Sequence, residues 1–315
     1  METVSVRSHP IWAYLQLIRP ANILTAWADI LVGYAATGSI SIVLKEPLSS
    51  GVAMSMTGDL WSSLGWLILS TSGLYGGGIV FNDVFDAELD QVERPERPIP
   101  SGRVPLQYAA VFGTLLLMMG ILAAAQVSLV SAGLAAAVAI AALTYDSLGK
   151  HQGFLGPLNM GLCRGGNLLL GVSAVPALLT ERWFLALIPV TYIAAVTAVS
   201  QGEVNGGKRQ TGVLAVVLVL LVLSGLLGLG LLDTYDWRAV LPFAGLFSAL
   251  VLPAFVKAAL DPSPETVQTA VRSGILSLIV LDAAIAAGFA GWPYGLVTLA
   301  LLPISRQLAR LFAMT

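Results

Sequence analysis

Charged residues are scarce in this sequence. Asp, Glu, Lys and Arg make up 11% of its 315 residues, whereas an ordinary soluble domain contains about 25%. The single cysteine, Cys163, excludes a disulfide framework within the chain and argues against a thiolate metal cluster. No basic cluster with interleaved aromatic residues occurs, so the sequence also argues against a nucleic-acid partner.

The sequence is instead rich in hydrophobic residues, which form 57% of the chain, and its mean hydropathy is +0.83. A helix needs about 20 apolar residues to cross the roughly 30 Å hydrocarbon core of a bilayer, and lipid-exposed strand edges would leave backbone groups unpaired. The sequence therefore predicts an all-α integral membrane protein, a bundle of about nine transmembrane helices. The predicted spans centre on residues 11–36, 61–81, 106–126, 128–145, 155–178, 183–200, 212–232, 239–258 and 270–291.

The polar residues of the first span, among them Arg19 and Asp29, would not be tolerated in the apolar core of a signal peptide, so we expect this span to be retained. Most cations fall in one set of loops. This bias predicts a multi-pass protein of the cell inner membrane whose charged loops are cytoplasmic. With nine spans the chain would end on the opposite side, but residues 292–315 leave open a short further span or an interfacial helix. No loop can bury a core of its own, which predicts one domain over residues 1–315.

A charged run, "NDVFDAELD", follows the second span. If one helix continues through this run, Asp83, Asp86 and Asp90 fall at i, i+3 and i+7 on one face, and Asn82 adds a carbonyl oxygen beside them. Carboxylates held this close repel one another unless a cation neutralises them. Mg²⁺ accepts one or two carboxylates and takes its other ligands from water and phosphate. We therefore expect a magnesium site here.

The next stretch, "RPERPIPSGR", carries Arg97 and Arg103, whose guanidinium groups can donate to phosphate. Its prolines end the helix and stiffen the loop. A loop that is charged only to stay hydrated is the plainer explanation, but carboxylates on one face at a membrane boundary indicate a function. Two further carboxylates, Asp29 and Asp282, lie inside apolar spans, and we expect each to face the bundle interior, protonated or paired, at the site or in a structural role.

Together these stretches resemble the first aspartate-rich motif, N-D-x-x-D-x-x-x-D, and adjoining loop of the UbiA superfamily of intramembrane prenyltransferases. The resemblance extends to "LIRPANILTA" in the first span, "YDSLGK" after the fourth and "GPLNMGLCRGGN" in the fifth. It implies a helical bundle around a central cavity. Carried over by position, it implies that Mg²⁺ and the diphosphate bind at Asn82, Asp83, Asp86 and Asp90. It also places four more residues at the diphosphate or along the cavity: Asn22, Lys150, Asn159 and Arg164.

The resemblance implies Mg²⁺-dependent transfer of an isoprenoid from a prenyl diphosphate to an acceptor that the sequence does not identify. Catalysis would rest on Asp83, Asp86, Lys150 and Arg164. Mg²⁺ and cationic side chains would stabilise the charge that develops on the leaving diphosphate. A cavity inside the bundle, open sideways to membrane lipid, would shield the allylic cation from water, and an aromatic face such as that of Tyr145 would stabilise it.

The second aspartate-rich motif of that family, close to D-x-x-D-x-x-G-D, is altered here to "QGEVNGGK". Gln201, Val204 and Lys208 stand where aspartates are expected, and Glu203 is the remaining carboxylate. In one alternative, Lys208 and Arg209 bind phosphate in place of a second Mg²⁺. In the other, ionisation is lost, and the protein is a non-catalytic lipid-binding, transport or assembly protein of a secondary-metabolite pathway, like the EboC proteins that the altered motif resembles. An ion-coupled transporter is a third possible class. Such a transporter is expected to carry its acids at the bilayer midplane, whereas most acids of this sequence lie at the membrane boundary.

Overall fold

The computed structural model describes residues 10–40, 51–149, 155–203 and 206–312. Every regular element within these ranges is helical, which confirms the predicted all-α fold. The first half of the chain contains α1 (Pro10–Ile18), α2 (Pro20–Ala36), α4 (Gly51–Phe85), α5 (Ala87–Glu93), α6 (Leu106–Ala125), α7 (Leu129–Thr144) and the π-helical turn η2 (Tyr145–Gly149). The second half contains α8 (Leu155–Val172), α9 (Leu179–Arg182), α10 (Leu187–Ser200), α11 (Arg209–Gly228), α12 (Trp237–Leu260), α13 (Pro264–Ala290), α14 (Trp292–Leu299) and α15 (Leu301–Phe312).

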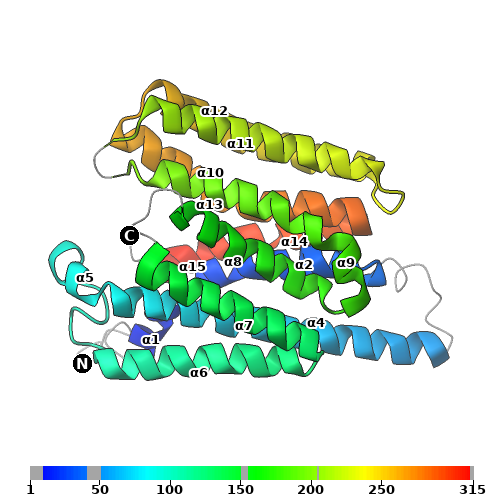
Figure 1. Ribbon diagram of the computed structural model, residues 1–315, viewed down its shortest axis with the longest axis horizontal. Helices are drawn as coiled ribbons and strands as arrows, with labels where there is room; N and C mark the ends of the chain where they lie inside the picture. The colour runs from blue at the N-terminus through cyan, green and yellow to red at the C-terminus, as the bar shows by residue number, and fades with distance from the viewer. Residues whose placement is uncertain (1–9, 41–50, 150–154, 204–205, 313–315) are drawn as a thin grey trace, which may run out of the picture.

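The long helices lie side by side along one common axis, and α5 lies at the same end of the bundle as α1 (Figure 1). Eight helical stretches of the described chain are long and apolar enough to cross a membrane. The helices α2 and α8, of 17 and 18 residues, run through the same bundle. With α2 and α8, the described residues hold ten helical stretches along the bundle, eight of which are long and apolar enough to cross a membrane, where the sequence predicts about nine.

The additional stretch is the pair α14 and α15, which runs back along α2. Tyr294 and Ser305 donate side-chain hydrogen bonds to backbone carbonyl oxygens of α2, at 3.3 and 2.8 Å. At the far end of α15, the ring of Phe312 stacks on Trp12 of α1, with 4.6 Å between centroids. Of the two alternatives for this segment, the structure has the further span. The expectation that α15 and α1 end on opposite sides is therefore wrong.

The predicted first span is divided at Arg19, which separates α1 from α2. Arg19 has φ 45° and ψ 69°, a left-handed backbone conformation that is uncommon for a residue other than glycine. Pro20, which begins α2, disfavours the right-handed helical conformation in the residue before it. The break lets the Arg19 side chain leave the helix axis and reach Asp83 of α4, with 2.5 Å between Nη2 and Oδ1.

The contact between α2 and α8 is close because glycines face each other across it. A Cβ atom at Gly33 would lie 2.1 Å from the carbonyl oxygen of Leu168, and one at Gly171 would lie 2.6 Å from that of Ile30. Membrane helices associate through such small residues because the backbones can approach. This approach holds the polar residues of α8 against α2, deep in the bundle.

Candidate functional site

A cavity of about 530 Å³ opens among α2, α4, α7, η2, α8, α10 and α13. Arg19, Asp146 and Glu203 line it where the charged loops lie, and apolar side chains of α4, α7, α10 and α13 form much of its wall. Thr71 and Asn167 line it farther along the helices. On α4 the lining runs from Asn82 to Thr71, a distance of about 16 Å at 1.5 Å per residue. The polar lining consists of Arg19, Asn22, Thr25, Thr71, Tyr75, Asn82, Tyr145, Asp146, Cys163, Arg164, Asn167, Thr197, Ser200 and Glu203.

The two charged loops meet at this end of the cavity, as their placement on one side of the bundle predicts. Glu203, which follows α10, interacts electrostatically with Arg94, which follows α5, and with Arg272 of α13. Burial raises the pKa of the Glu203 carboxyl, while these two arginines act to lower it. The two charged loops therefore border the same opening of the cavity, which we call its mouth.

The prediction of one uninterrupted helix through "NDVFDAELD" is wrong at Asp86. α4 ends at Phe85, Asp86 has φ −89° and ψ 3°, and α5 begins at Ala87. Asp83 and Asp90 keep a common side, but an arginine joins them: Nη1 of Arg97 lies 3.3 Å from Oδ1 of Asp83 and 2.6 Å from Oδ2 of Asp90. Arg19 contacts Asp83 as well.

The expected stack of three carboxylates is therefore not observed. Within the part of the chain that the structure describes, no three carboxylate, imidazole or thiol groups gather as metal ligands. The negative charge of Asp83 and Asp90 is balanced by guanidinium groups. In the arginine loop, Arg97 is buried, and Arg103 donates to Oε1 of Gln16 and to the carbonyl oxygen of Glu96. Binding of these two arginines to the diphosphate stays a prediction.

Arg164 lines the cavity from α8, and the bonds of its guanidinium group point toward α2. It donates to Oγ1 and to the carbonyl oxygen of Thr25, at 3.1 and 2.9 Å, and its Nε lies 3.2 Å from Oδ2 of Asp29. Asn167 donates to the same Asp29 oxygen at 2.9 Å, and the ring of Tyr75 lies 6.0 Å from the guanidinium carbon. A buried arginine in the bundle is thus neutralised and oriented by α2.

The two carboxylates predicted inside apolar spans meet in this network. Asp29 and Asp282 are 0% and 1% exposed, and they interact electrostatically with each other and with Arg164. Neither lines the cavity, so the structure gives both a structural place beside Arg164.

The remaining predicted residues divide into three groups. Asn22, Asn82, Tyr145 and Glu203 line the cavity, as expected. Asn159 lies 4.0 Å from the sulfur of Cys163 but does not itself line the cavity. Lys150 lies outside the described residues.

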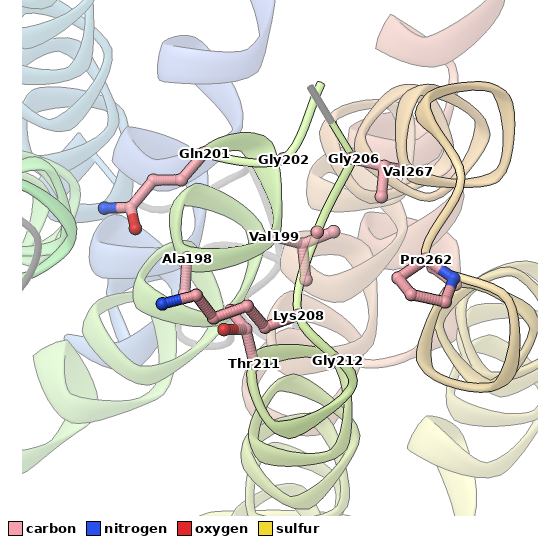
Figure 2. Close-up of a pocket in the computed structure, with 12 residues that line it drawn as sticks. Ala198, Val199, Gln201, Gly202, Gly206, Lys208, Thr211, Gly212, Pro262 and Val267 are labelled. Atoms are coloured by element: carbon pink, nitrogen blue, oxygen red, sulfur yellow. The ribbon is translucent and has the colours of Figure 1, made fainter. Parts of the chain in front are cut away.

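Lys208 lines a second, smaller pocket of about 220 Å³, between the ends of α10 and α12 and the start of α11. Figure 2 shows the side chains of Gln201 and Lys208 extending to one side of this pocket, with Pro262 and Val267 on the other. Arg209 is exposed and lines neither pocket. The structure does not bring these two cations into the larger cavity.

Sequence reasoning missed two charged residues of the larger cavity, Arg19 and Asp146. Asp146 is 5% exposed and accepts a hydrogen bond from Nδ2 of Asn82, 3.0 Å from its Oδ1. Its position gives the signal: it lies four residues after Ala142 and eight after Val138, two α7 residues that line the cavity. For Arg19 the signal is the helix break that precedes Pro20.

The oxygen donors of the larger cavity fit Mg²⁺. Asn82 and Asp146 place an amide and a carboxylate side by side at the polar end, and Glu203 adds a second carboxylate. Magnesium that binds through a substrate diphosphate needs only one or two carboxylates from the protein, because water and phosphate oxygens supply the rest. A cluster of three protein carboxylates is therefore not required.

The model of the UbiA prenyltransferase family matches residues 47–273, well over half of this chain. Three curated relatives are all named digeranylgeranylglyceryl phosphate synthase. The one from Methanothrix thermoacetophila is 28% identical and covers 74% of this chain and 85% of its own length. The one from Methanosarcina mazei is 30% identical and covers 67% of this chain and 76% of its own length. The one from Ignicoccus hospitalis is 28% identical, and the match spans 66% of this chain but only 64% of that relative.

Two solved structures have a similar fold. The structure described as digeranylgeranylglyceryl phosphate synthase in membranes matches with a TM-score of 0.65 and 21% identity, over 89% of this chain and 99% of that one. A UbiA homologue from Archaeoglobus fulgidus, bound to DMAPP and Mg²⁺, matches with a TM-score of 0.56 and 14% identity, over 91% and 99%. At these identities the likeness shows the fold alone.

Proposed function

This chain belongs to the UbiA prenyltransferase family, and on that premise we propose that it transfers an isoprenoid from a prenyl diphosphate to a lipid acceptor, with Mg²⁺, inside the membrane. The observation that carries the proposal is the larger cavity, which has charged residues at its mouth and apolar side chains along much of its wall. A prenyl diphosphate has the same division. Its diphosphate carries about three negative charges, and its tail is hydrocarbon, whose burial is worth about 0.8 kcal/mol per CH₂.

At the mouth, Asn22, Asn82 and Arg19 are the groups that we propose to bind the diphosphate, with Mg²⁺ held near Asn82 and Asp86. When bound, Mg²⁺ neutralises the leaving diphosphate. Arg164, which is paired with Asp29, presents its guanidinium group farther in, and the hydrogen bonds to Thr25 keep that group in place. The face of Tyr145 lies on the cavity wall, where it can stabilise an allylic cation.

In the transfer, the bond between the allylic carbon and the diphosphate oxygen breaks, and a new bond forms from that carbon to an acceptor atom. The acceptor loses a proton, and diphosphate leaves with the electron pair. We propose a glyceryl phosphate lipid with a free hydroxyl group as the acceptor, because the relatives described above are named digeranylgeranylglyceryl phosphate synthase. The product would then be an ether.

The test is incubation of the purified protein with labelled C10, C15 and C20 prenyl diphosphates and Mg²⁺, with and without a monoprenylated glyceryl phosphate. We expect diphosphate release and a new labelled ether lipid with the acceptor present. Tight binding of the prenyl diphosphate without release would favour the non-catalytic alternative, for which the altered second loop is the supporting observation. The narrower resemblance to EboC proteins stays a prediction.

A further inference from the structure

We propose that the hydrogen-bonded pair of Thr71 and Asn167 closes the inner end of the larger cavity and limits the isoprenoid that fits it to about three units, C15. The inference rests on the proposed function, because it names the length of the donor that the same cavity takes. It makes these two residues determinants of chain length.

The larger cavity ends inside the bundle. On α4 its lining runs about 16 Å from Asn82 to Thr71, and on α13 it runs about 10 Å from Val271 to Leu278, at 1.5 Å per residue. The residues one helical turn farther in are buried and do not line the cavity: Asp29 of α2, Leu67 of α4 and Asp282 of α13. A chain that enters at the mouth therefore meets packed side chains at the level of Thr71.

A row of hydrogen bonds crosses the bundle at this inner end. Oγ1 of Thr71 donates to Oδ1 of Asn167, at 2.7 Å. Nδ2 of Asn167 donates to the carbonyl oxygen of Ala26 and to Oδ2 of Asp29, both at 2.9 Å. The amide of Asn167 thus has its oxygen and both of its hydrogens engaged. It cannot turn aside for a longer chain without leaving buried polar groups unpaired.

The depth of the cavity sets the length of the chain. An isoprene unit adds four carbon–carbon bonds, about 5 Å when extended. With the diphosphate at the mouth, three units fill the roughly 16 Å from Asn82 to Thr71, whereas four units need about 20 Å. A C20 chain would have to bend or leave between helices, and part of it would lose the contacts of the wall.

Two substitutions on α4 change this depth in opposite directions. Thr71→Ala removes a hydroxyl and a methyl group, which releases Asn167 and opens the inner end. Gly78→Leu puts a side chain across the cavity about 6 Å from the level of Asn82. A Cβ atom at Gly78 meets the Cβ of Ala142 at 3.5 Å, an ordinary contact distance, so the helices need not move.

The measurement is equilibrium binding of labelled C5, C10, C15 and C20 prenyl diphosphates, with Mg²⁺, to the purified full chain in detergent. We expect the wild type to bind C15 about tenfold more tightly than C20, because overfilling a packed site is costly. Thr71→Ala should bring this ratio close to one, and Gly78→Leu should make C5 or C10 the preferred length. Uptake of free ligand by micelles is the same for every variant, so it cancels when the ratios are compared.

Gly65→Leu is the matched control, because Gly65 is exposed on the same helix, has nothing within 4 Å of an added Cβ and does not line the cavity. It should keep the wild-type order of lengths. Thr71→Ser retains the hydroxyl group and should discriminate against C20 more than Thr71→Ala does.

Wild-type binding of C20 as tight as that of C15 would overturn the inference. An unchanged order of lengths in Gly78→Leu would overturn it as well, and this test does not depend on whether Thr71→Ala folds. Failure of the wild type to bind a prenyl diphosphate of any length would overturn the proposed function and this inference with it.

Discussion

Asp83 and Asp86 share one motif but have different surroundings. Asp83 is 3% exposed and contacts both Arg19 and Arg97, whereas Asp86 lies at the break between α4 and α5. The sequence of the motif predicts the same role, binding of Mg²⁺ and the diphosphate, for both aspartates. The pairing of Asp83 depends on the break before Pro20 and on the path of the arginine loop, and neither follows from residue spacing within the motif.

The two aspartates should therefore respond differently to substitution. Asp83→Asn leaves Arg19 without its carboxylate and leaves Arg97 with Asp90 alone, so we expect the free energy of unfolding to fall by about 2 kcal/mol. Asp86→Asn should lose Mg²⁺-stimulated binding of a prenyl diphosphate. Thermal unfolding in detergent and Mg²⁺ titration of binding check the two halves. Equal Mg²⁺ stimulation in Asp86→Asn and wild type would contradict its role at the metal.

Arg164 offers a test of geometry at constant charge. Arg164→Lys keeps a cation, but a single ammonium group cannot reproduce two hydrogen bonds to Thr25 together with the contact to Asp29. We expect the affinity for a prenyl diphosphate to fall about tenfold, since one such interaction is worth about 1.4 kcal/mol. Binding isotherms measure the change. An unchanged affinity would show that position along α8, and not orientation, is what matters.

Between elements, the glycine contact of α2 and α8 sets the distance from Arg164 to Asp29. Gly33→Ala puts a methyl group where the carbonyl oxygen of Leu168 lies 2.1 Å away, so one helix must move. We expect lower thermal stability and weaker diphosphate binding together. Gly245→Ala in α12 is the control, because nothing lies within 4 Å of the added Cβ, and alanine favours a helix by up to about 1 kcal/mol.

For the loop between α10 and α11, the sequence and the structure lead to different expectations about the role of Lys208. From the sequence, Lys208→Asp should weaken binding, since Lys208 would replace a missing metal. Because Lys208 lines the smaller pocket, we expect this variant to change diphosphate affinity no more than a few-fold, as for a solvated charge. A large loss, restored at raised Mg²⁺ by aspartates at 201, 204 and 208 together, would favour the sequence-based hypothesis.

For the whole molecule, hydrophobic runs were sufficient to predict the helices and the place of the charged mouth, because membrane helices must satisfy their own backbone groups. The ends of α6, α7 and α12 lie within two residues of the predicted spans. The sequence leaves the return of α14 and α15 open, because a run that includes Arg306 and Arg310 is also typical of an interfacial helix, and its packing along α2 is visible only in the structure. Asp146 was missed because its neighbours across the cavity come from other helices.

The return of α15 gives a topology that labelling can check. In a Cys163→Ala background, cysteines at Glu96 and Arg310 should react with an impermeant maleimide from the same side of the membrane, because α5 and α15 end together. Cysteines at Gln126 and Thr234, which follow α6 and α11 at the other end, should react from the opposite side. Labelling of positions 96 and 310 from different sides would contradict the return of α15.

Cys163 lines the larger cavity next to Arg164 and is the only thiol in the sequence. The protein therefore carries its own occupancy probe. A small organomercurial that enters the cavity can be captured at this one sulfur, and its rate of capture reports whether the space is filled. Slower capture in the presence of a prenyl chain of a given length would measure how far that chain reaches, with no engineered label in the molecule.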